Sequence, residues 1–120
     1  VRLVGSEMCI REAFDILVTQ DAENDLKNIR DYIASNISKK TSIRIINFIK
    51  SSIERLSLFP QFAPVVKYEP WNSLGVRRII VKNFLVYYRV VLEENTVYIL
   101  KVTYGKRNQQ TVLEQIDLLD

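Results

Sequence analysis

The stretch VRRIIVKNFLVYYRV, residues 76–90, decides the fold of this chain. β-branched and aromatic residues dominate it, which predicts two adjacent β-strands at 76–82 and 84–92. A third strand is predicted at 96–103, after a tight turn at Glu93-Glu94-Asn95. These strands therefore predict a meander in the second half of the chain.

Helical spacing dominates the first half of the chain. After a short β-prone segment at 14–19, two apolar stripes recur every three or four residues, with a polar break at 36–40. Thr19 or Asp21 is suited to cap the first helix. The stripes consist of Leu26, Ile29, Ile33 and Ile37, and then of Ile43, Ile46, Ile49, Ile53 and Leu56. We predict an α+β fold: an N-terminal strand and a two-helix hairpin packed on one face of a small antiparallel β-sheet.

Residues 59–73 hold all three prolines and show no periodicity, so they predict a long loop. Trp71 is expected to pin this loop onto the core.

Composition excludes several classes of protein. With 120 residues the chain is long enough for one domain, placed here at residues 8–120. For residues 1–7, which precede the only methionine, a remnant added for expression is one interpretation. The longest apolar run is five residues, far short of the roughly 20 that span a membrane.

Histidine is absent and Cys9 is the only cysteine. A metal site and a histidine-dependent nucleophile are therefore not expected, and neither is any cofactor. A single cysteine fits a reducing compartment, so we expect a cytoplasmic protein.

Positive charge gathers in one part of the chain. Residues 67–107 contain eight basic and three acidic residues, a net charge of +5, whereas residues 108–120 carry −3. A basic segment of this kind favours a partner that carries phosphate or carboxylate groups. A solvated sheet face with scattered cations is the alternative interpretation.

Alternation along the middle strand assigns its two faces. Phe84, Val86 and Tyr88 should contact the helices, because the opposite face holds Arg89, and an unpaired buried guanidinium would be very costly. Leu85 then shares the open face. The predicted target- or nucleic-acid-binding residues on this open face are Tyr87, Arg89, Arg77, Arg78 and Lys82, with Lys106 and Arg107 at its rim.

Three motifs in order resemble the RelE/ParE family of bacterial toxins. The first is 19–26 with Ile29 and Tyr32-Ile33 behind it. The second runs from Val76-Arg77-Arg78 to 86–90, and the third from 97–102 to the exit 104–107. The resemblance covers about 100 residues.

This resemblance implies the toxin of a type II toxin–antitoxin system, which inhibits growth once it is released from its antitoxin. The antitoxin would be acidic and would fold on binding. The target would be DNA gyrase, as in the ParE branch, or the ribosome and its mRNA, as in the RelE branch.

The resemblance also assigns catalytic roles for the ribonuclease alternative. Arg78 and Arg107 would stabilise charge on the phosphate, and Glu69 would serve as a base. Apart from the resemblance, the phenols of Tyr87 and Tyr104 could act only if the surrounding cations lowered their pKa values. Leu85, however, stands where family ribonucleases place an arginine, and no tyrosine or histidine follows Tyr104. We therefore favour gyrase inhibition, with an mRNA endonuclease and a non-toxic or degenerate binding module as alternatives.

Overall fold

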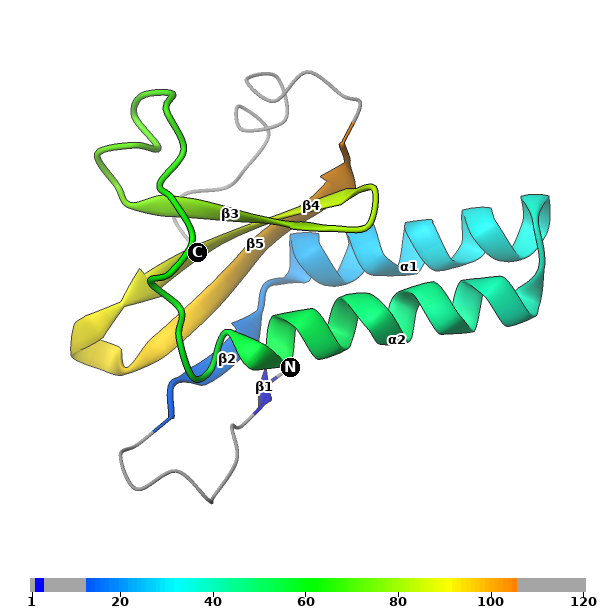
Figure 1. Ribbon diagram of the computed structural model, residues 1–120, viewed down its shortest axis with the longest axis horizontal. Coiled ribbons are helices and arrows are strands. Elements are labelled where there is room, and N and C mark those ends of the chain that lie inside the picture. The colour runs from blue at the N-terminus through cyan, green and yellow to red at the C-terminus, as the bar shows by residue number, and fades with distance from the viewer. Residues whose placement is uncertain (1, 4–12, 106–120) are drawn as a thin grey trace.

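The computed structural model describes residues 2–3 and 13–105. Its sheet has the strand order β1-β2-β5-β4-β3, and two helices lie on one side of it (Figure 1). The elements are β1 (Arg2–Leu3), β2 (Asp15–Val18), α1 (Gln20–Asn36), α2 (Lys39–Arg55), β3 (Val76–Val81), β4 (Phe84–Val91), the 3₁₀ turn η1 (Leu92–Glu94) and β5 (Thr96–Tyr104). The predicted α+β architecture is confirmed, with element ends within a few residues of those expected.

One strand pair departs from the predicted antiparallel sheet. β2 runs parallel to β5, with Asp15 opposite Thr96 and Val18 opposite Ile99, whereas the other pairs are antiparallel. The reason is that β2 joins the outer edge of the meander's last strand, a choice that no local pattern encodes. Residues 2–3, which were left out of the fold prediction, pair with β2 as an edge strand.

Two capping residues start the helices. Thr19 accepts a hydrogen bond from the Ala22 amide at 3.3 Å, and Ser38 accepts one from the Thr41 amide at 3.0 Å. The predicted hairpin stripe is buried at Leu26, Ile33, Ile46, Ile49 and Ile53, and Ile29 is partly buried. Ile37 and Ile43 are exposed instead, because the tip of the hairpin projects beyond the sheet (Figure 1).

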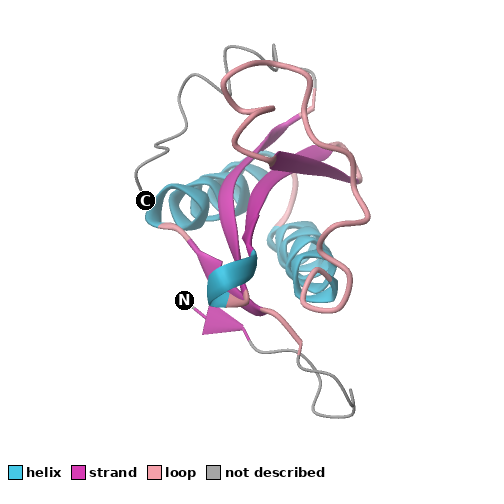
Figure 2. Cartoon of the chain, turned by 90° about the vertical axis from the view of Figure 1, so that its left-hand side faces the viewer, coloured by secondary structure: helices cyan, strands magenta, loops and turns pink. Residues whose placement is uncertain are grey.

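The sheet is covered on both faces. The helices cover the face that carries Val86 and Tyr88. On the other face a second apolar cluster joins Val66 and Trp71 of the loop to Leu85, Tyr87 and other strand residues. Figure 2 shows this loop climbing from the end of α2 to β3. Trp71 is 6% exposed, so the predicted pinning of the loop is confirmed.

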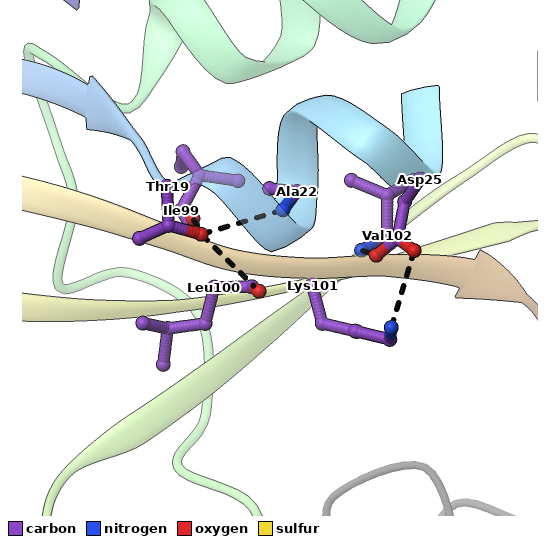
Figure 3. A network of polar contacts seen from close by, with 7 residues as sticks. All are labelled: Thr19, Ala22, Asp25, Ile99, Leu100, Lys101 and Val102. Carbon is purple, nitrogen blue, oxygen red and sulfur yellow. Dashed lines mark hydrogen bonds and ion pairs between the residues drawn. The ribbon is translucent and has the colours of Figure 1, made fainter. Parts of the chain in front are cut away.

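Near the end of β2, backbone groups of β5 form hydrogen bonds with Thr19 and with Asp25 of α1 (Figure 3). The amide and hydroxyl of Thr19 donate to the Ile99 carbonyl at 3.1 and 2.8 Å. Further along, the Asp25 carboxylate accepts from the Val102 amide at 3.0 Å and from the Lys101 ammonium at 3.1 Å. Burial raises the pKa of Asp25, and these two donors oppose that rise. The Asp25 carboxylate of α1 thereby bonds a β5 amide that lies beyond the end of β2.

Candidate protein-binding surface

The sheet face that was expected to be open is filled. Tyr87 and Leu85 are buried beneath Val66 and Trp71, so the prediction that Tyr87 lies on an open face and binds a target or nucleic acid is wrong. Burial raises the pKa of Tyr87, while the charge of Arg78 opposes the rise. The same arginine also lowers this pKa through a side-chain hydrogen bond to the phenol. Alternation assigned the face correctly, but nothing in the strand pattern revealed that a loop covers it.

Arg77 has a structural role on the opposite face, where it lies directly across from Tyr88. Its guanidinium donates to the carbonyls of Gln61, at 3.1 Å, and of Ala63. The Tyr88 hydroxyl donates to the Pro60 carbonyl at 2.6 Å. Burial raises the pKa of Tyr88 to about 12, although Arg77 opposes the rise. Together the two side chains fix the segment 60–63, so Arg77 does not belong to the predicted sheet-face site.

The prediction that Lys82 lies on the open face of the sheet is also wrong. β3 ends at Val81, so Lys82 lies in the two-residue β3–β4 turn with a φ of 57°. Its ammonium sits 4.5 Å from the ring centroid of Phe48 on α2, a cation–π contact on the helix side.

The remaining candidates are dispersed. The Glu69 carboxylate accepts from the Ser73 amide at 3.1 Å and hydroxyl at 2.7 Å, which closes a turn within the loop. Arg89 is half-buried between β3 and β5. Lys106 and Arg107 lie outside the described residues.

Arg78 is the candidate that reaches an accessible hollow. This hollow of about 300 Å³ is also lined by Lys67 and Tyr68. Two cations and a phenol therefore meet beside β3, an arrangement that suits an anionic group. Lys67 and Tyr68 were missed as a group because the loop conformation alone brings them to Arg78.

An apolar groove lies between the end of α2 and β3. It has a volume of about 470 Å³, and its lining includes Leu56, Phe59, Phe62 and Ile80. Phe59 and Phe62 are each 72% exposed and Ile80 is 67% exposed. Large exposed apolar side chains gathered at a groove indicate a protein-binding surface. The sequence analysis did not predict this surface, although two phenylalanines three residues apart in a loop without periodicity were a signal.

Comparison with known proteins identifies the family. The model of the ParE toxin of type II toxin–antitoxin systems, parDE, matches residues 16–109. The chain belongs to this family. The predicted resemblance is therefore confirmed, and the chain is a toxin of a type II toxin–antitoxin system.

Two solved structures share the fold of this ParE-family toxin. A chain of the chromosomal ParDE system from P. aeruginosa is 21% identical, with a TM-score of 0.65, over 76% of this chain and 95% of that chain. A chain of the RelBE2 toxin–antitoxin complex from Mycobacterium tuberculosis is 19% identical, with a TM-score of 0.53, over 77% of this chain and 91% of that chain. No curated protein matches the sequence.

A second groove runs along the hairpin of this toxin. It has a volume of about 610 Å³, with Val18, Leu26, Ile46 and Ile53 among its lining and charged side chains of both signs beside them. Within the described part of the chain, no group of three His, Cys, Asp or Glu side chains could hold a metal ion. No described helix is long and apolar enough to cross a membrane.

Proposed function

We propose that this toxin inhibits growth by binding DNA gyrase and not by cleaving RNA. The burial of Tyr87 carries the proposal, because a fully buried phenol beneath a packed loop is out of reach of a substrate phosphate. Burial also raises the pKa of this phenol, whereas catalysis by a phenolate would require a lowered one.

Two other features support the same proposal. Arg77 is engaged with loop carbonyls, and Glu69 is engaged with Ser73. The exposed groove between α2 and β3 supplies a surface for a protein target. Binding a protein needs such a surface and a stable scaffold, and it needs no acid–base pair.

The ribonuclease alternative keeps one specific point in its favour. Arg78 and Lys67 line one hollow, where a phosphate group would find two cations. Among the described residues, this hollow is where the ribonuclease alternative would place the phosphate.

We also propose that an acidic antitoxin neutralises the toxin in the cytoplasm, where both DNA gyrase and the ribosome are found. Both structural relatives come from toxin–antitoxin systems. The net charge of +5 over residues 67–107 favours an acidic partner.

Induced expression with two measurements tests the target. Purified toxin should lower the supercoiling activity of gyrase in a dose-dependent manner, while primer extension on total RNA should find transcripts intact. Tyr87→Phe should leave gyrase inhibition unchanged, because its hydroxyl is buried.

Ribosome-dependent cuts in mRNA would contradict the proposal. Their loss in Arg78→Ala, with the fold retained, would assign the chemistry to the hollow beside Arg78. A chain that affects neither gyrase nor mRNA, but still binds an antitoxin, would be the degenerate binding module.

A further inference from the structure

β3 leaves part of the sheet edge open. It is the last strand in the sheet order and pairs with β4 only. The loop bridges its first half, with Val65 opposite Arg77 and the Val66 amide donating to the Val76 carbonyl at 2.9 Å. Successive residues of a strand point their backbone groups to opposite sides, so the backbone of Ile80, like that of Val76, faces outward. Among the described residues, these outward groups of Ile80 have no hydrogen-bond partner.

The uncovered part of β3, residues 79–81, has no lysine, proline or bulge. Edge strands are usually blunted by lysines, prolines or bulges, because an open edge can pair with another chain. At this edge the exposed side chain is Ile80, and two hollows of about 470 and 310 Å³ meet beside it. Both hollows are lined by Phe62, Ile79 and Ile80.

The phenylalanine beside the edge is held in place. Phe62 belongs to the segment that Arg77 and Tyr88 fix through the carbonyls of Pro60, Gln61 and Ala63. Its 72% exposure is therefore a property of a fixed backbone, and a partner would find the surface already formed.

Charge indicates which occupant fits. Arg55 lines the first hollow and Arg78 lines the second, and no acidic side chain lines either of them. A second copy of this chain would bring like charges together at the edge. An acidic and apolar segment would instead place carboxylates near the two arginines and apolar side chains in the hollows.

We propose that an extended acidic and apolar segment of the antitoxin adds a strand to the free edge of β3 at Ile80. Backbone hydrogen bonds to Ile80 would supply the pairing, and alternate side chains of the segment would enter the two hollows. The inference rests on the proposed function, because it takes the antitoxin as the partner.

Three variants of the full chain test this strand addition, with the product of the neighbouring reading frame as the probe. Ile80→Pro removes the outward N–H but no hydrogen bond to β4, and proline is tolerated at such edge positions. Ile80→Val keeps the N–H and serves as the matched control. We expect calorimetry to give about tenfold weaker binding for Ile80→Pro and nearly unchanged binding for Ile80→Val, in line with the loss of one hydrogen bond.

Phe62→Ala should weaken binding by about tenfold or more as an anchor residue. Leu92→Ala, which removes a 59% exposed side chain on η1, should not. Thermal unfolding of each variant checks the fold. Amide exchange followed by NMR should show the Ile80 amide protected in the complex and not in the free toxin.

The outcomes separate the two proposals. Wild-type affinity in Ile80→Pro, or an unprotected Ile80 amide, would overturn strand addition and leave the antitoxin assignment standing. A neighbouring product that does not bind the wild type would overturn both. A free toxin that dimerises, and an Ile80→Pro variant that does not, would assign the edge to a second copy and overturn the proposal.

Discussion

Two neighbouring tyrosines in β4 are buried on opposite faces of the sheet, Tyr88 against the helices and Tyr87 against the loop. Both are fully buried, but only the Tyr88 hydroxyl donates a hydrogen bond, to the Pro60 carbonyl. Tyr88→Phe leaves a buried carbonyl without its donor, so the free energy of unfolding should fall by about 1–3 kcal/mol. Tyr87→Phe removes a hydroxyl whose polar neighbour is the half-buried Arg78 side chain, which can still meet water, so the loss of stability should be smaller, at most about 1 kcal/mol. Urea unfolding of both variants checks the pair, and equal losses would contradict it.

The raised pKa of Tyr88 also predicts a loss of stability in alkali. Its folded-state pKa of about 12 exceeds its ordinary value of 10.0, so the folded protein holds this proton more tightly than the unfolded chain. The stabilisation is complete below pH 10 and is lost as the pH rises to 12, by roughly 3 kcal/mol in total. Between these values Tyr88→Phe should lose less stability than the wild type. Unfolding curves at several pH values measure this difference, and parallel losses would rule it out.

At the scale of elements, the junction of α1 with β5 depends on Asp25. Asp25→Ala leaves the Val102 amide without its acceptor and Lys101 without its counter-charge, so we expect a loss of about 2–3 kcal/mol. Asp31→Ala on the same helix removes only an exposed pair with Arg30, for which we expect at most about 0.5 kcal/mol. Denaturant unfolding compares the two, and a similar cost for both would show that the β5 edge does not need Asp25.

Local pattern predicted most of the elements, but not how they cover one another. Helical spacing and the cap at Thr19 located the hairpin, and period-two alternation placed Tyr88 against it. The burial of Tyr87 depends on Trp71 and the loop around it. The sequence of this loop shows no periodicity from which its position could be predicted. For the same reason the predicted basic face did not assemble. Charged residues are easy to count along a chain, whereas their partners are set by loop geometry.

At the scale of the whole molecule, charge should govern how fast the antitoxin is captured. The net charge is +3, and the excess lies in the half of the chain that builds β3 to β5. Association with an acidic antitoxin should therefore slow as salt rises, while dissociation changes less. Stopped-flow measurements between 50 mM and 500 mM salt, about a threefold change in screening length, test this. An association rate that does not depend on salt would contradict it.

The position of β5 has a consequence for how the toxin is made. β5 lies between β2 and β4, and Thr19 bonds to carbonyls that are 80 and 81 positions away in the sequence. The ribosome therefore synthesises about four-fifths of the chain, the hairpin included, before β5, the strand that joins the two parts of the sheet. Until residue 96 has emerged, the nascent chain has no completed sheet. A message that is cut or stalled upstream of that codon yields a fragment without the central strand, so only products of nearly complete translation are expected to fold into the toxin.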